Sequence, residues 1–313
     1  MVKVIVGMMG SSVGKGAAAL STNSAVSEFL SNVKAHGVHE LDTARVYVNG
    51  QSEELLGSVS AAKTFAVSTK APAFAPGSLA PDKIESNCAA SLKALATDKV
   101  DIYYLHGPDR QTPLEEQCRA IGKLYKEGKF TRFGVSNISD QEVSKIYEIC
   151  QREGYPLPKV YQGGYNPIGR GPEKTLFPLL RKLGMSFYAF SPLAGGLLAK
   201  PVSELLTPKA GTRFDEMKMF GHIYLTPIIL GALAKVQKVC DDEGITLMEA
   251  TLRWFMHHSP LGEADGFILG ASSTAQVEAS LKATEQGPLP ASLVNSWEEM
   301  YKEIEHSLPM YHM

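Results

Sequence analysis

The 313-residue sequence lacks several features that would direct it to particular classes of protein. No apolar run approaches the ~20 residues that a membrane-spanning helix needs. Basic and acidic residues nearly balance, at 31 and 33, so no large positive field is available to attract a nucleic acid backbone. We therefore expect neither a membrane nor a nucleic acid as a partner.

Cysteine is scarce, with only four in the chain, and no Cys-x-x-Cys pair occurs. The four are widely spaced and three fall inside helical patterns, which favours reduced, buried thiols in a cytoplasmic protein over a disulfide framework. The sequence also has no His-x-x-x-His or His-Glu-x-x-His motif, so we expect no metal site.

A Gly-x-Gly-x-x-Gly motif after the first strand, the mark of an open dinucleotide-binding sheet, is missing as well. Short apolar runs instead alternate with amphipathic segments, which indicates a parallel sheet with helical crossovers. Eight such units favour a closed (β/α)8 TIM barrel, a single domain over residues 1–313, over an open doubly wound sheet. The predicted strands are Val4–Gly7, Val38–Asp42, Phe65–Lys70, Val100–His106, Phe133–Ser136, Val160–Gln162, Ser186–Ser191 and Phe267–Gly270.

One stretch, about Leu193–Leu225, shows no periodicity and is too long for an ordinary connection. We expect it to form a long flap loop after the seventh strand, over the mouth of the barrel. Extra helices are expected towards the C-terminus. The predicted helices lie near 24–36, 51–58, 82–96, 113–127, 139–153, 173–183, 226–243, 246–258, 273–286 and 290–306.

Four polar residues at or near predicted strand ends suggest an active site: Asp42, Tyr47, Lys70 and His106. The C-terminal ends of the strands of a parallel barrel surround one mouth. A Tyr hydroxyl holds its proton until about pH 10. An ammonium such as that of Lys70 would lower the pKa of Tyr47, while Asp42 keeps Lys70 protonated. His106 would offer an N–H to a carbonyl oxygen. Singly, these residues suit structural ion pairs or a core histidine; together they favour catalysis.

Such a pocket polarises a carbonyl group but contains no obvious nucleophile, metal set or carboxylate pair, so it needs a hydride carrier. Nicotinamide is the simplest carrier, because barrels commonly bind phosphate through the loops after strands seven and eight. Ser191–Leu198 contains two adjacent glycines whose backbone N–H groups could approach a pyrophosphate. In the next loop, Ser273 and Gln276 have the spacing of a capping box at a helix start that could hold an anion.

These residues resemble the motifs of the aldo-keto reductases over nearly the whole chain. The matching segments include Leu41-Asp-Thr-Ala, Gly50-Gln-Ser-Glu-Glu-Leu-Leu-Gly57, Gly134-Val-Ser-Asn137 and Pro192-Leu-Ala-Gly-Gly-Leu-Leu198. Glu285-Gln-Gly-Pro-Leu289, with other segments, is similar to the aflatoxin-aldehyde reductase branch. The resemblance implies an NADPH-dependent barrel enzyme that reduces aldehydes or ketones to alcohols, with Tyr47 as proton donor, and dimers occur in this branch.

The resemblance also implies which residues bind NADPH or NADP. Three would hold the nicotinamide carboxamide, and Arg213 in the flap would contact the adenosine phosphates. Many members stack an aromatic residue on the nicotinamide from the seventh strand; position 191 is Ser here, which leaves Tyr165 or Tyr188 as alternatives. The implied cofactor-binding residues are Ser136, Asn137, Gln162, Ser191, Leu193, Gly195, Gly196, Leu197, Arg213, Gly270, Ser272, Ser273, Gln276 and Glu278.

Two departures from the family pattern concern the substrate. Members that reduce succinic semialdehyde use arginines in the flap and at the extreme C-terminus to bind a carboxylate, whereas neither Phe220–Leu225 nor 309–313 contains arginine. We therefore expect neutral, fairly apolar carbonyl substrates. A cofactor-binding regulatory subunit with little turnover, similar to potassium-channel β subunits, remains an alternative. A barrel hydrolase is disfavoured because no carboxylate pair lies at strand ends.

Overall fold

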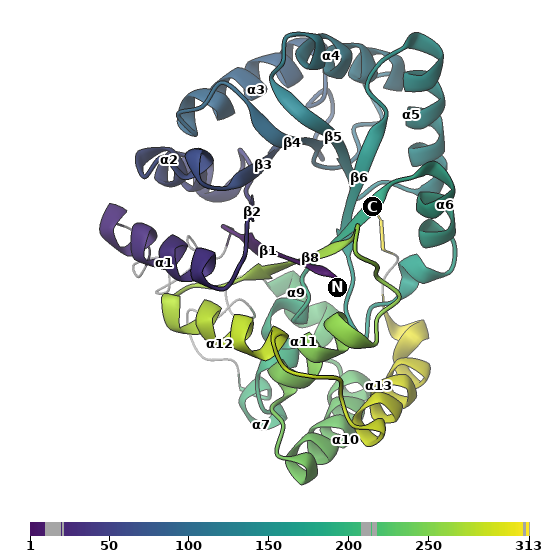
Figure 1. The fold of residues 1–313 in the computed structure, drawn as a ribbon. Helices are drawn as coiled ribbons and strands as arrows, with labels where there is room; N and C mark the ends of the chain where they lie inside the picture. Colours follow the sequence, from purple (N-terminus) through teal and green to yellow (C-terminus); the bar gives the residue numbers. More distant parts are fainter. Residues whose placement is uncertain (10–19, 21, 208–213, 215–217, 309–310, 313) are drawn as a thin grey trace.

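The computed structural model describes residues 1–9, 20, 22–207, 214, 218–308 and 311–312. Eight parallel strands form a closed barrel in chain order, with β1 paired to β8, and helices surround it (Figure 1). The (β/α)8 barrel is therefore confirmed. The strands are β1 Lys3–Gly7, β2 Glu40–Asp42, β3 Ala66–Ala71, β4 Val100–Leu105, β5 Phe130–Ser136, β6 Pro158–Gly164, β7 Ser186–Phe190 and β8 Gly266–Gly270.

The helices that follow the strands around the barrel lie within three residues of the predicted ranges. They are α1 Asn23–Ala35, α2 Gln51–Ser58, α3 Pro81–Ala94, α4 Leu114–Lys126, α5 Asp140–Glu153, α6 Leu176–Leu183, α11 Leu247–His257 and α12 Thr274–Thr284. Two further helices, α10 Pro227–Glu243 and α13 Ala291–Ile304, pack against each other beside α11 (Figure 1). The helices expected towards the C-terminus, near 273–286 and 290–306, are α12 and α13.

The start and end of α10 illustrate how the sequence sets a helix boundary. The Thr226 side chain accepts a hydrogen bond from the backbone N–H of Ile229, and Pro227 occupies the first turn, where its missing N–H costs nothing. Gly244 ends the helix with φ +68°, a left-handed conformation that glycine adopts without strain.

Two strands extend three or more residues beyond the apolar runs that predicted them. β5 begins at Phe130 rather than Phe133 because Arg132 is accommodated by ion pairs with Asp101 and Glu40, so a charged residue lies within the strand. β6 extends through two glycines to Gly164, and a Cβ atom at Gly163 would lie 2.7 Å from the ring of Tyr161. Because these extensions contain a charged residue in β5 and glycines in β6, the pattern of apolar residues does not predict them.

The long connection after β7 contains more regular structure than a flap loop. A 3-10 segment, Ala194–Ala199, and the short helices α7 Val202–Leu205 and α9 Lys218–Tyr224 lie within the stretch predicted to be irregular. Helices of one or two turns are too short to produce a readable period. Of the two short helices, α9 contacts the 3-10 segment, which also contacts α11.

The core lies inside the barrel and between the barrel and its helices. All four cysteines are free and buried, as predicted, and no described helix is long and apolar enough to cross a membrane. Within the barrel, Tyr188 donates a hydrogen bond to Glu40 at 2.8 Å and accepts one from Arg132 at 3.2 Å. These charges lie near the strand beginnings, at the end opposite the predicted site.

Candidate active site

The predicted quartet meets at the C-terminal ends of β2, β3 and β4. Asp42 is the last residue of β2, Lys70 is the penultimate residue of β3, and His106 directly follows β4. Tyr47 begins a 3-10 turn after β2, and its ring lies near Lys70 and His106. Parallel strands thus bring residues 64 positions apart into one cluster.

Lys70 is completely buried but has charged and polar neighbours. Its Nζ donates hydrogen bonds to Oδ1 of Asp42 at 2.5 Å and to the Thr43 carbonyl oxygen at 2.7 Å. Burial alone would lower the pKa of Lys70, but the attraction of Asp42, followed by that of Tyr47, raises it above its ordinary value. Lys70 is therefore a buried ammonium over the physiological pH range.

Tyr47 lies beside the buried ammonium of Lys70. The Nζ atom of Lys70 lies 5.0 Å from the centre of the Tyr47 ring. The two following residues, Val48 and Asn49, have φ values of +51° and +55°. Such a value is unusual for the β-branched Val48 and strains the backbone there. The turn is supported by Arg45, whose Nη1 contacts Oε2 of the fully buried Glu53 at 2.5 Å.

His106 is held as a neutral imidazole. Burial, followed by the nearby positive charge of Lys70, lowers its pKa to about 3. Its ring packs edge-on against Tyr47, with centroids 5.8 Å apart, and against Phe74, with centroids 5.5 Å apart. A neutral imidazole carries one N–H donor, which is the group expected at a carbonyl oxygen.

The three residues predicted to hold the carboxamide lie beside the quartet. Gln162 donates from Nε2 to Oδ2 of Asp42 at 2.8 Å. Ser136 of β5 lies opposite Gln162 of β6 in the sheet register. Asn137, with φ +59°, donates from Nδ2 to Oγ of Ser136 at 2.9 Å and to the carbonyl oxygen of His106 at 3.0 Å. Their amide and hydroxyl groups surround the same end of the barrel.

The loop after β7 combines glycine with left-handed backbone. Ser191 has φ +54°, and Gly195 and Gly196 have φ +70° and +106°. The N–H of Gly196 donates to the Leu193 carbonyl oxygen at 2.8 Å, so it closes a turn. Leu193 is half-buried and Leu197 is buried. No described atom would contact a Cβ at Gly196, which leaves room above this backbone.

The loop after β8 starts α12 with the predicted cap. Oγ of Ser273 accepts a hydrogen bond from the backbone N–H of Gln276 at 3.3 Å. The Gln276 side chain reaches back to the N–H and hydroxyl of Ser272, at 3.0 and 2.8 Å, rather than to the cap residue. Gly270 is exposed at the end of β8, and Glu278 pairs with Lys282 at 2.6 Å.

Comparison with known proteins agrees with this architecture. The model of the aldo/keto reductase family matches residues 3–302. The chain belongs to the aldo-keto reductases. It is similar to oxidoreductase sirO of Leptosphaeria maculans, with 39% identity over 91% of this chain and 88% of that protein. It is also 39% identical to aflatoxin B1 aldehyde reductase member 2 of Rattus norvegicus, over 88% of this chain and 79% of that protein.

A human relative, aldo-keto reductase family 7 member A3, is likewise 39% identical, over 88% of each chain. The resemblance to the aflatoxin-aldehyde reductases is therefore confirmed, and this reductase is an oxidoreductase of a family that acts on carbonyl compounds and typically uses nicotinamide cofactors. Among the described residues, no group of three or more His, Cys, Asp or Glu side chains could hold a metal ion.

Neither tyrosine considered for stacking on nicotinamide lies at the mouth of the reductase. Tyr188 points to the opposite end of the barrel, where it contacts Glu40. Tyr165 packs between barrel and helices, and its hydroxyl donates to Glu173 at 2.6 Å. Tyr188 does face the barrel interior, but at a level near the strand beginnings, and Tyr165 follows the end of β6 and packs against Trp254 of α11. Neither tyrosine is therefore placed to stack on a nicotinamide at the mouth. Arg213 lies outside the described residues.

Tyr224 is an aromatic residue that sequence reasoning did not single out. It ends α9 and is within hydrogen-bonding reach of the Asn166 side chain, which in turn donates to the carbonyl oxygen of Ser191 at 3.2 Å. Tyr224 therefore approaches the end of β7, the place where an aromatic residue was sought. In the sequence, the one feature that pointed to Tyr224 was its place in the aperiodic segment Leu193–Leu225.

Proposed function

We propose that this reductase converts neutral, apolar aldehydes or ketones to alcohols with NADPH, and that Tyr47 donates the proton to the carbonyl oxygen. The observation that carries the proposal is the buried Lys70 ammonium, placed between the Asp42 carboxylate and the Tyr47 ring. Electrostatic coupling is reciprocal: since Tyr47 favours the charged form of Lys70, Lys70 favours the phenolate form of Tyr47. Asp42 keeps this ammonium in place.

The neutral state of His106 suits the second polar role. A carbonyl oxygen bound between Tyr47 and His106 could accept one hydrogen bond from the imidazole while Tyr47 transfers its proton. A charged imidazolium would compete with Tyr47 as the acid, and the depressed pKa of His106 prevents this. Positioned proton transfer contributes typically ~10²–10⁴-fold to a rate.

The structure offers groups that fit a nicotinamide cofactor. Asn137 and Gln162 present amide groups and Ser136 a hydroxyl beside the quartet, which matches the donors and acceptors of a carboxamide. The half-buried Gly196 and the exposed Gly270 have free space above their Cα atoms, which leaves room for phosphates beside the backbone. A bound nicotinamide would supply the hydride that these side chains cannot. The buried, free thiols favour a reducing compartment, the cytoplasm.

The surroundings of the mouth support a neutral, apolar substrate. Val46 and Phe74, next to Tyr47 and His106, have 48% and 47% of their surface exposed, so apolar groups flank the reacting end. Neither Phe220–Leu225 of the flap nor residues 309–313 contain the arginine that would bind a carboxylate. We expect the kcat/KM for benzaldehyde to exceed that for succinic semialdehyde by at least about tenfold, equivalent to about 1.4 kcal/mol. Similar values would contradict the neutral-substrate assignment.

The Tyr47→Phe variant tests the proposed chemistry. It keeps the ring that packs on His106 but removes the hydroxyl, so carbonyl reduction should fall about 10²-fold or more. NADPH binding, followed by fluorescence titration, should remain close to that of the wild type. Wild-type turnover in the variant would refute Tyr47 as proton donor. A wild-type protein that binds NADPH but reduces no carbonyl in a broad panel would favour the regulatory subunit instead.

A further inference from the structure

The orientation of the His106 ring is not set by a hydrogen bond to Nδ1. This atom is buried and has no hydrogen-bond partner among the described residues. The ring instead lies between two aromatic neighbours, Tyr47 and Phe74, both in edge-on contact. An N–H donor stabilises a carbonyl oxygen only when it is aimed at that oxygen. The residues that hold Tyr47 and Phe74 against the His106 ring therefore affect the reaction.

Phe74 is fixed by the chain that follows His106. It has φ +74°, an uncommon value for a bulky residue, and its N–H donates to the carbonyl oxygen of Pro108 at 3.3 Å. Its ring also lies on Gly107, where a Cβ atom would come within 2.1 Å of Cε1 of Phe74. A strained residue persists only where its surroundings determine its position.

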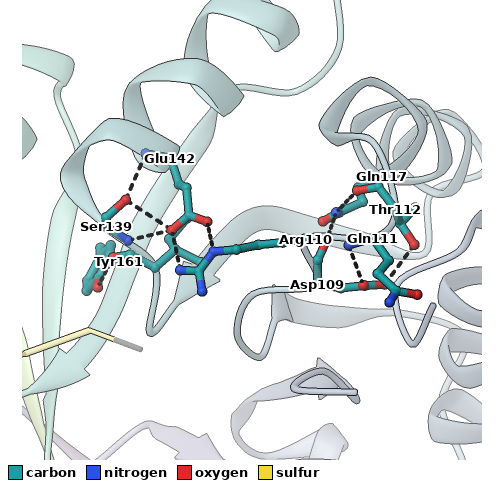
Figure 2. A network of polar contacts seen from close by, with 9 residues as sticks. Asp109, Arg110, Gln111, Thr112, Gln117, Ser139, Glu142 and Tyr161 are labelled. Carbon is teal, nitrogen blue, oxygen red and sulfur yellow. Dashed lines mark hydrogen bonds and ion pairs between the residues drawn. The ribbon is translucent and has the colours of Figure 1, made fainter. Parts of the chain in front are cut away.

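Asp109 joins the two segments that carry Phe74 and His106. Its Oδ1 accepts hydrogen bonds from the backbone N–H groups of Gly77 and Gln111, each at 3.1 Å. Its Oδ2 accepts from the N–H of Leu79 at 2.9 Å and from the hydroxyl of Thr112 at 2.7 Å. Figure 2 shows the carboxylate facing Gln111 and Thr112 on its own turn. Four donors use the full accepting capacity of a carboxylate.

The ionised form of Asp109 is favoured by this arrangement. Burial would raise its pKa, but the hydrogen bonds, first from Leu79 and then from Thr112, outweigh burial and lower the pKa below its ordinary value. The side chain is 5% exposed and contacts no described basic group in these bonds. Its charge is therefore neutralised by backbone and hydroxyl dipoles that belong to two loops.

The adjacent Arg110 forms a second link from the same turn. Its guanidinium extends away from Asp109 to Glu142, with Nε 3.0 Å from Oε1, and Glu142 caps α5 together with Ser139 (Figure 2). The loop between His106 and α4 is thus connected to both neighbouring loops. Only the link through Asp109 is buried, because Arg110 is exposed.

We propose that Asp109 is a positioning residue for His106: its carboxylate clamps the segment after β3 onto the turn after β4 and so holds Phe74 against the imidazole ring. The inference rests on the proposed function, in which His106 contacts the carbonyl oxygen. It assigns Asp109 a role in turnover that a simple loop-stabilising residue would not have.

The Asp109→Asn variant is the direct perturbation. An amide offers one accepting oxygen and places an NH₂ group against donors, so two of the four hydrogen bonds are lost. Because a displacement of about 1 Å can cost ~10²-fold in rate, we expect kcat to fall about tenfold or more while the Kd for NADPH stays within about twofold. Asp98→Asn, in the exposed turn before β4, is the matched control and should leave both values unchanged.

A double-mutant cycle distinguishes positioning from stabilisation. If Asp109 acts through His106, the Asp109→Asn change should lower kcat less than about twofold in a His106→Gln background. Equal effects in both backgrounds would overturn the proposal. If Asp109→Asn does not fold, Thr112→Val, which removes one of the four donors, replaces it in the cycle, with a smaller effect expected in the same direction.

A spectroscopic readout separates this inference from the proposed function. In protein labelled with ¹⁵N-histidine, the His106 ring signals are assigned by their loss in His106→Gln. They should shift or broaden in Asp109→Asn or Thr112→Val and stay unchanged in Asp98→Asn. Unchanged signals in the Asp109 and Thr112 variants would refute the clamp, whatever the activity. A wild-type protein without carbonyl reduction would refute the proposed function, while these signals would still test the clamp.

Discussion

Acid should destabilise this reductase through His106, and the His106→Gln variant should remove that sensitivity. The pKa of His106 is about 3 in the folded protein, against an ordinary value of 6.5 in the unfolded chain. Between these values the unfolded chain binds one more proton than the folded protein, so stability rises with pH and is lost as the pH falls below about 6.5. At pH 5 the difference of about 1.5 pH units corresponds to about 2 kcal/mol.

Urea unfolding followed by circular dichroism at pH 7.5 and pH 5.0 measures this effect. The wild type should lose about 2 kcal/mol more unfolding free energy between these values than His106→Gln does. His306→Gln, at a side chain that is 89% exposed, controls for the removal of an imidazole and should behave like the wild type. An equal loss in wild type and His106→Gln would show that His106 is not held neutral by burial and the charge of Lys70.

Three further substitutions test other parts of the structure. Lys70→Met should lower turnover by at least about 10²-fold. It should also destabilise the fold by about 3–5 kcal/mol, because it leaves the Asp42 carboxylate buried without its cation. An active variant that is as stable as the wild type in the same urea assay would contradict this. Asp265→Ala removes a buried carboxylate that pairs with Arg181 far from the mouth. The unfolding free energy should fall by about 3–5 kcal/mol, while kcat per folded molecule stays unchanged. A reduced kcat would be inconsistent with a purely structural role. Gly50→Ala places a Cβ 1.7 Å from Nη2 of Arg45 at φ +93°, so steady-state kcat should fall, and a variant as active as the wild type would show that this turn does not hold the site.

The quartet was predictable because its signals are local. Each of Asp42, Lys70 and His106 follows an apolar run, and the geometry of a parallel barrel collects such strand ends at one mouth. The cap at Ser273 was equally readable, because N-capping depends on a spacing of three residues. Helix and strand positions therefore follow closely from the periodicity of apolar residues.

Features that depend on partners distant in sequence were not predictable in this way. Arg132 lies within β5 because Asp101 and Glu40 neutralise it, which no pattern of hydrophobicity reveals. Tyr188 was one of two alternatives for stacking on the nicotinamide, but its hydroxyl bonds to Glu40 near the strand beginnings. The clamp formed by Asp109 joins loops 30 residues apart through backbone N–H groups, which carry no sequence signature at all.

The most direct test of the central claim follows deuterium from the cofactor to the product. Wild-type protein is incubated with NADPH deuterated at C4 of the nicotinamide and with benzaldehyde, and the alcohol is analysed by mass spectrometry. The proposed function predicts deuterium on the former carbonyl carbon, at a rate about 10²-fold or more above that of Tyr47→Phe. Alcohol without deuterium, or equal rates in the two proteins, would contradict it.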